Sequence, residues 1–104
     1  MEQLIKLVKT YRLSSGLAER QRLADAILRL IASDLCAFVF SAIKPQAAED
    51  VSQEVLISIT ASLKTFEGSS NGEFWKWCYK IARRRIYDHI RKKGSDRLQP
   101  MPHD

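Results

Sequence analysis

Basic side chains dominate one segment near the end of this 104-residue chain. Between positions 76 and 93 the sequence holds eight lysines and arginines and a single acid, Asp88. At about 100° per residue, a helix gathers most of these cations on one face. The predicted basic face consists of Lys76, Lys80, Arg83, Arg84, Tyr87 and Arg91. Like charges at this spacing repel one another by about 0.2–0.5 kcal/mol per pair, and nucleic-acid phosphates would offset that repulsion.

A solvated face that aids solubility is the alternative interpretation of this segment. Aromatic rings near the cations favour nucleic acid, because aromatic faces stack on unpaired bases. The predicted apolar stripe of this helix consists of Phe74, Trp77, Cys78, Ile81 and Ala82. Trp75 lies at the border of this stripe and is included with the basic face, whereas Trp77 is expected in the core. Arg85 falls at the centre of the apolar stripe, so it snorkels, pairs with a buried acid, or marks where the domain surface ends.

A second polar row precedes this segment, in a stretch predicted to be helical from residue 46 to residue 64. Its members follow one another at i, i+3, i+4 and i+7, which places them on one helix face. They are Asp50, Gln53, Glu54 and Ile57. An apolar ridge of Val51, Val55, Ile59 and Leu63 runs beside them and is the predicted core side. A solvated acidic face, suited to the helix dipole, is the alternative.

Catalysis and metal binding are not expected, and no cofactor is predicted. The chain has two histidines, His89 and His103, and no nucleophile–base or carboxylate pair is indicated by spacing. His89 falls toward the apolar side of the last helix, which favours a structural role. Cys36 and Cys78 each lie in an apolar stretch and are expected to be reduced, buried thiols.

Helices are the elements expected to position these residues. The periodicity predicts an all-α, compact bundle of about four helices, over residues 2–12, 17–43, 46–64 and 72–93, without strand alternation. Pro45 separates the second helix from the third and suits a first turn. Residues 65–72 form a loop, and Ser70 with Glu73 predicts a capping box that opens the last helix. Residues 1–93 are the predicted domain, and 94–104 begin a linker or tail.

Composition is that of a soluble globular protein. The chain is 45% hydrophobic and 28% charged, and its formal net charge of +5 favours a polyanionic partner. The longest apolar run, residues 35–40, is too short to span a bilayer, and the start of the chain lacks the pattern of a signal peptide. We expect a cytoplasmic protein without membrane insertion.

Three stretches together resemble region 2 of bacterial RNA polymerase sigma factors of the extracytoplasmic-function group. AEDVSQEV at residues 48–55 is similar to that family's acidic DAEDLVQE stretch, and FEGSS at 66–70 is similar to its FRGDS loop. FWKWCYKIAR at 74–83 with DHIR at 88–91 is similar to its FRTWLYRIARNLAIDHLRR helix. The resemblance covers about residues 17–93.

The resemblance implies a function and assigns roles by position. Region 2 of this family binds the clamp helices of the largest subunit of the RNA polymerase core, which would be the role of the row Asp50–Ile57. It also binds the promoter's minus-ten element, melts it and captures a flipped base of the non-template strand. Implied loop contacts are Phe66, Gly68, Ser69, Ser70 and Asn71; implied contacts to single-stranded phosphates and upstream duplex are Trp75, Lys76, Lys80, Arg83, Arg84, Tyr87 and Arg91. An anti-sigma factor is a further partner that the group implies.

Four departures from the family pattern lie in the implied DNA surface. Glu67 stands where the family has arginine, Arg84 replaces an asparagine, Arg85 replaces a leucine, and the loop is about two residues longer. Because of these departures, the resemblance implies promoter-type binding but does not identify the promoter sequence. The changes at Glu67 and Arg84 support an alternative, a regulatory protein-interaction module that has lost promoter binding.

The second DNA-binding domain of the family, a helix-turn-helix, does not occur in these residues. We expect the chain to be a piece of a longer protein, with a standalone region 2 that acts with another subunit as the alternative. Together, the acidic row and the basic helix are expected to form two opposed surfaces, one for polymerase and one for DNA.

Overall fold

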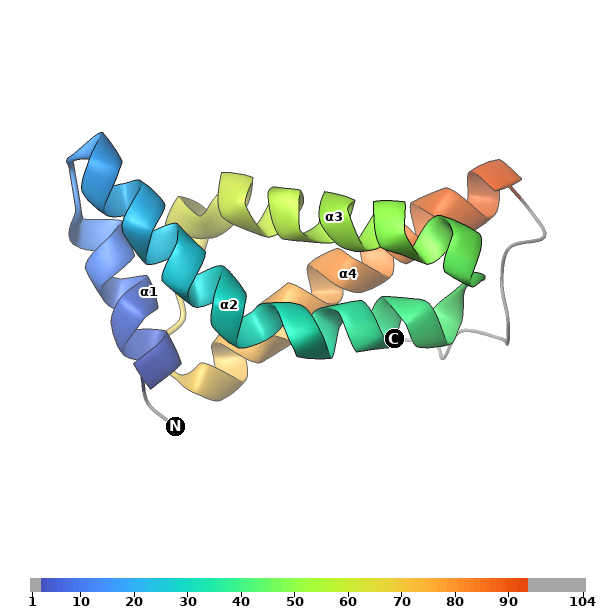
Figure 1. The fold of residues 1–104 in the computed structure, drawn as a ribbon. Helices are drawn as coiled ribbons and strands as arrows, with labels where there is room; N and C mark the ends of the chain where they lie inside the picture. Colours follow the sequence, from blue (N-terminus) through green and yellow to red (C-terminus); the bar gives the residue numbers. More distant parts are fainter. Residues whose placement is uncertain (1–2, 94–104) are drawn as a thin grey trace.

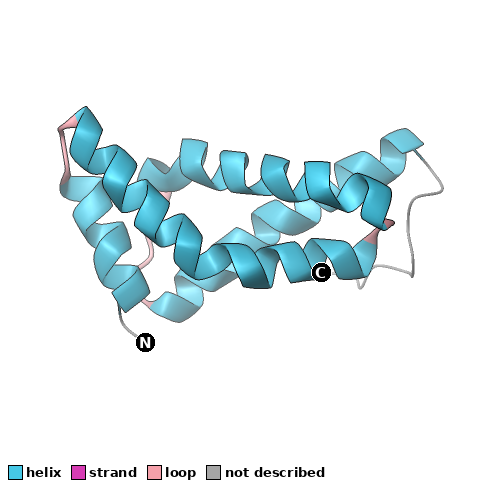
Figure 2. Cartoon of the chain, in the orientation of Figure 1, coloured by secondary structure: helices cyan, strands magenta, loops and turns pink. Residues whose placement is uncertain are grey.

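The computed structural model describes residues 3–93, which form four α-helices and one short 3-10 turn (Figure 1). The helices are α1 (Gln3–Leu13), α2 (Leu17–Ala42), α3 (Pro45–Ser62) and α4 (Asn71–Lys93), and the 3-10 turn η1 is Leu63–Thr65. No strand forms within this range, and the loops are short (Figure 2). The predicted all-α bundle is therefore confirmed, and the predicted tail, 94–104, lies outside the described residues.

Helices α2 and α3 lie side by side in front of α4, and α1 lies at one end of the molecule (Figure 1). Helix α2 packs against α3, α4 crosses both from behind, and α1 packs on the first half of α2 (Figure 1). The molecule measures 43 × 25 × 20 Å along its principal axes. Within the described range, no helix combines the length and the hydropathy that a membrane crossing requires.

The boundaries of α3 follow from its end residues. Pro45 occupies the first turn, where its missing N–H costs nothing, and the Lys44 carbonyl accepts the N–H groups of Ala47 and Ala48, both at 3.0 Å. The helix ends at Ser62 rather than near Lys64 as predicted, because residues 63–65 tighten into η1. A 3-10 turn is a common way for a helix to end.

The core lies between the apolar stripes of the helices. The predicted ridge of α3 is confirmed, since Val51, Val55, Ile59 and Leu63 are all buried. The predicted stripe of α4 is confirmed for Phe74, Cys78 and Ala82, which have 0% exposure, and Ile86 joins it. Trp77 and Ile81, predicted with this stripe, are half-buried and pack against the core.

The i, i+4 row of α4 explains both the burial of Ile86 and the position of Arg85. Such a row advances around the helix by about 40° per step, and it is buried when a helix crosses its neighbours at an angle. By position 86 the buried side has turned away from Arg85, which is exposed and donates from Nε to Ser58 Oγ of α3 at 2.9 Å. Arg85 therefore lies at the rim of the α3–α4 contact, without a buried acid.

The two cysteines differ in environment. Cys78 is fully buried in α4, and burial raises the pKa of its thiol to about 12. Cys36 is half-buried, so the prediction of two buried thiols is correct for Cys78 only. Neither forms a disulfide.

Candidate functional site

The loop between η1 and α4 is anchored at its start by an aromatic cluster. Phe66 is 5% exposed, and its ring meets the Phe74 ring edge-on at 5.1 Å and the Trp77 ring at 5.4 Å. Gly68 follows so closely that a Cβ there would lie 2.5 Å from Phe66 Cζ. The ring of Phe66 packs in the core, where it fixes the start of the loop, and the expected contact of this residue with DNA stays a prediction.

The end of the loop is fixed by the predicted capping box, which is confirmed. Ser70 Oγ accepts the N–H of Glu73 at 3.1 Å, and the Glu73 carboxylate accepts the N–H groups of Ser69 at 2.8 Å and Ser70 at 3.1 Å. These bonds, that from Ser69 first, lower the pKa of Glu73. Ser69 and Ser70 are exposed, so they remain accessible to a ligand while they shape the turn.

A groove of about 1210 Å³ lies between the start of α3 and the end of α4, and a smaller hollow of about 580 Å³ lies beside the loop. We name the smaller one the loop groove. It joins the loop to the first half of α4 and combines backbone, aromatic surface and cations. Its lining residues are Thr65, Phe66, Glu67, Gly68, Glu73, Lys76, Trp77, Lys80 and Arg83.

The basic face of α4 continues from the loop groove. A second hollow, of about 460 Å³, is lined by Lys80, Arg83, Arg84, Tyr87, Asp88 and Arg91. We name this second hollow the basic track. Lys80 and Arg83 line both hollows, so the loop groove and the basic track are continuous. The one acid among the residues that line the basic track is Asp88, which forms an ion pair of 2.9 Å with Arg91. The structure thus brings together every predicted α4 contact except Trp75.

Trp75 lies on a different flank of α4. It is half-buried, and its ring lies 5.9 Å from that of Tyr79, which contacts Phe38 of α2 edge-on at 5.1 Å. It lines neither the loop groove nor the second hollow. Trp77, assigned to the core from the sequence, is half-buried and packs against the core, and it also lines the loop groove. Its position three residues after Phe74 and close to the loop is the signal that identifies it.

Asn71 is the last predicted loop contact, and it already has a partner. The residue is the first of α4 and half-buried, and its Oδ1 accepts the backbone N–H of Ile5 in α1 at 2.9 Å. Its amide therefore links two helices, and a direct contact with DNA stays a prediction.

The acidic row occupies the exposed face of α3. Asp50, Gln53, Glu54 and Ile57 are all exposed, and Ile57 is 66% exposed despite its apolar side chain. An isoleucine in water beside carboxylates suits a protein partner, because its burial on binding is favourable.

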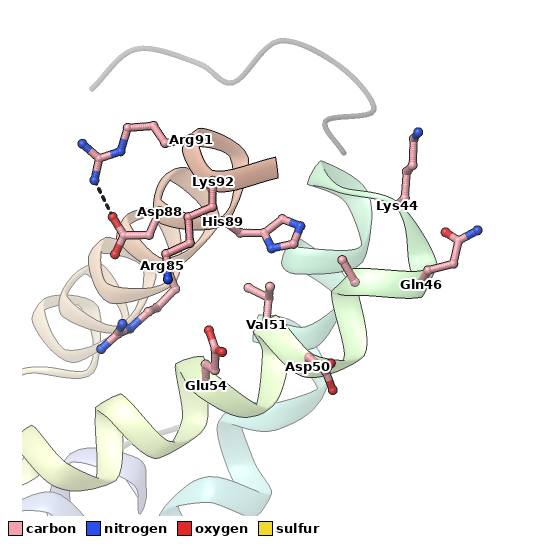
Figure 3. A pocket seen from close by; sticks show the side chains of 11 residues that line it. Lys44, Gln46, Asp50, Val51, Glu54, Arg85, Asp88, His89, Arg91 and Lys92 are labelled. Atoms are coloured by element: carbon pink, nitrogen blue, oxygen red, sulfur yellow. Dashed lines mark hydrogen bonds and ion pairs between the residues drawn. The ribbon is translucent and has the colours of Figure 1, made fainter. Parts of the chain in front are cut away.

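The acidic row and the basic track adjoin rather than oppose one another. The 1210 Å³ groove between the start of α3 and the end of α4 is lined from α3 by Asp50 and Glu54 and from α4 by Arg85, Asp88, His89, Arg91 and Lys92, with Lys44 at its edge. Glu54 points toward α4, whereas Asp50 points away from it (Figure 3). Arg91 and Asp88 line both this groove and the basic track. The expected opposed surfaces are therefore neighbours.

Comparison with known proteins identifies one family. The family model described as Sigma-70 region 2 matches residues 21–95, which is most of the chain. The match begins within α2, so α1 lies before it. No curated protein and no solved structure matches the chain.

Proposed function

The chain belongs to the sigma-70 region 2 family, and we propose from this that it binds RNA polymerase core through the acidic row and the promoter's minus-ten element through the basic track and the loop groove. Polymerase binding and promoter recognition are the family's part in transcription initiation. Melting of the element, capture of a flipped base and membership of the extracytoplasmic-function group are the finer parts of the proposal.

The observation that carries the DNA half is the continuity of the loop groove with the basic track. Lys76, Lys80 and Arg83 extend from the loop along α4, so a single strand with a base in the groove would have its phosphates beside cations. Trp77 offers an aromatic surface at the groove, where a flipped base can stack. The N–H groups of Ser69 and Ser70 already donate to Glu73, so the exposed hydroxyl group of Ser69 is the loop group that can bond a base edge.

The polymerase half is supported by the separation of charge on α3. The helix buries its apolar ridge and presents the two carboxylates of Asp50 and Glu54, with Gln53 between them and Ile57 one turn further. Such a face suits a basic and partly apolar partner surface. The clamp helices of the polymerase are that partner in the proposal.

Selection of single-stranded oligonucleotides from a random pool, with and without polymerase core, tests the DNA half. We expect a defined sequence to be enriched and to bind more tightly than its scrambled version at two salt concentrations. Lys80→Ala should weaken binding of both the enriched strand and its scrambled version. It should also reduce the slope of log K against log salt by about 0.7, the value for one phosphate contact in a single strand. Lys6→Ala, at an exposed position of α1, is the matched control and should change neither.

The same selection distinguishes promoter binding from the alternative function. If no sequence is enriched in either condition, the chain does not read promoters, and a regulatory protein-interaction module becomes the better account. The exposed Glu67 in the loop groove is the feature that favours this alternative, because a carboxylate there repels phosphate.

A further inference from the structure

Helix α1 contacts both ends of the loop that runs from Phe66 to Asn71. Arg12 Nη1 donates to the Phe66 carbonyl at the start of the loop, and its guanidinium carbon lies 5.8 Å from the centre of the Phe66 ring. Asn71 Oδ1, at the end of the loop, accepts the N–H of Ile5 at 2.9 Å. These partners are 54 and 66 residues apart in sequence, so the contacts exist only in the folded chain.

Each of the two contacts satisfies a group that the loop or helix would otherwise leave without a partner. The Ile5 N–H is in the first turn of α1, where backbone donors lack intrahelical acceptors. The Phe66 carbonyl belongs to a nearly buried residue at which η1 has ended. A charged donor gives a stronger bond to a carbonyl than a neutral one.

Helix α1 is itself firmly placed, so it can serve as a support. Leu4, Ile5, Val8 and Tyr11 are buried in the common core, and α1 packs on α2, η1 and α4. Arg12 holds the ring of Phe66, and Gly68 packs on the edge of that same ring. The shape of the loop therefore depends on a helix that lies outside the residues matched by the family.

We propose that α1 is a positioning element, which acts through Arg12 and Ile5 to hold the loop in its DNA-binding shape before DNA arrives. This inference rests on the proposed function of the loop and adds residues to which the family match assigns no role. A loop ordered in advance loses less entropy on binding, so removal of the support should lower affinity for the correctly read strand most. Arg12 itself is a positioning residue, since its guanidinium is occupied by Phe66.

Arg12→Ala, compared with Lys9→Ala on the same helix, tests the proposal. Both substitutions remove one positive charge, but Lys9 is exposed and Arg12 holds the loop. For Arg12→Ala we expect amide hydrogen exchange of residues 67–70 to accelerate about tenfold, as the loss of one charge-assisted bond implies. Exchange in the centres of α3 and α4 should not change. Affinity for the enriched strand should fall about tenfold, and affinity for its scrambled version should fall less. Lys9→Ala should match the parent chain.

Two further variants make the test specific. Arg12→Lys keeps a donor for the Phe66 carbonyl, so its loop exchange and its affinity for the enriched strand should lie between those of Arg12→Ala and the parent chain. Asn71→Asp keeps the acceptor for the Ile5 N–H, so amide exchange at the end of the loop should match that of the parent chain, whereas Asn71→Ala should accelerate it.

Three outcomes overturn the proposal. Unchanged loop exchange in Arg12→Ala would show that α1 does not hold the loop, and weaker binding without faster exchange would make Arg12 a direct DNA contact. Equal acceleration throughout α3 and α4 would reduce its role to global stability. Failure of the parent chain to discriminate strands is a separate result, which counts against the proposed function while the exchange measurement still reports on the α1 support.

Discussion

Glu73 is the residue that connects the loop to α4 most directly. Its carboxylate accepts N–H groups from Ser69 and Ser70, and these bonds hold its pKa below the ordinary value of 4.5. A carboxyl whose pKa is lower in the folded chain than in the unfolded chain stabilises the fold above the unfolded pKa. That contribution is lost as pH falls through the folded pKa.

Thermal unfolding at two pH values should report this linkage. At pH 7 the parent chain should melt at a higher temperature than Glu73→Gln, because the charged acceptor is lost in the variant. Well below pH 4 the difference should shrink, since the parent carboxyl is then protonated as well. Glu67→Gln, at an exposed acid in the same loop, serves as the control. A melting difference that is equal at both pH values would contradict the assigned role of the Glu73 charge.

At the scale of the element, substitutions on the exposed face and on the buried face of α3 should have different effects. Ile57 and Ile59 lie two residues apart, the first 66% exposed and the second fully buried. Ile59→Ala should lower the free energy of unfolding by about 2–5 kcal/mol, as buried isoleucines do. Ile57→Ala should leave stability nearly unchanged and weaken polymerase binding. Denaturant unfolding and a binding titration of the same two proteins check both halves.

The reverse pattern would show that the exposed face of α3 is not an interface. A stability loss from Ile57→Ala comparable with that of Ile59→Ala would mean that Ile57 packs against the domain. Unchanged polymerase binding with unchanged stability would make its exposure incidental.

Local features of the helices were predictable from the sequence, but the side of α4 that is buried along its second half was not. The capping box at Ser70 and the first turn at Pro45 depend on neighbouring residues, so their chemistry is visible in the sequence. A fixed helical wheel places Arg85 in the core because it assumes that neighbours lie parallel to the axis. Once α4 crosses them, the buried side turns with the i, i+4 row, and Trp77 rather than Trp75 lines the loop groove that we propose for DNA.

At the scale of the molecule, the packing of the helices determines where the two candidate surfaces lie relative to each other. The acidic row and the basic residues of α4 were each predicted, but a sequence does not give the angle between two helices. Packing of α3 on α4 brings Glu54 and Arg91 to the same groove. The support of the loop by α1 is likewise invisible in the sequence, because its partners are more than fifty residues apart.

In the proposed function, the neighbouring surfaces would let one small domain contact polymerase and promoter at the same time. A polymerase element on the acidic row would lie beside the end of the basic track, where Arg91 and Asp88 border both hollows. The whole account therefore depends on the acidic row being the polymerase contact.

Binding of the chain to the polymerase clamp helices is the most direct measurement of that claim. Asp50→Arg combined with Glu54→Arg should weaken binding by roughly a hundredfold, because two attractive charges become repulsive. Glu19→Arg combined with Asp25→Arg makes the same change of net charge at exposed positions of α2 and should leave binding nearly unchanged. Circular dichroism should show both double variants folded. Equal affinities for the parent chain and the Asp50/Glu54 variant would contradict the account.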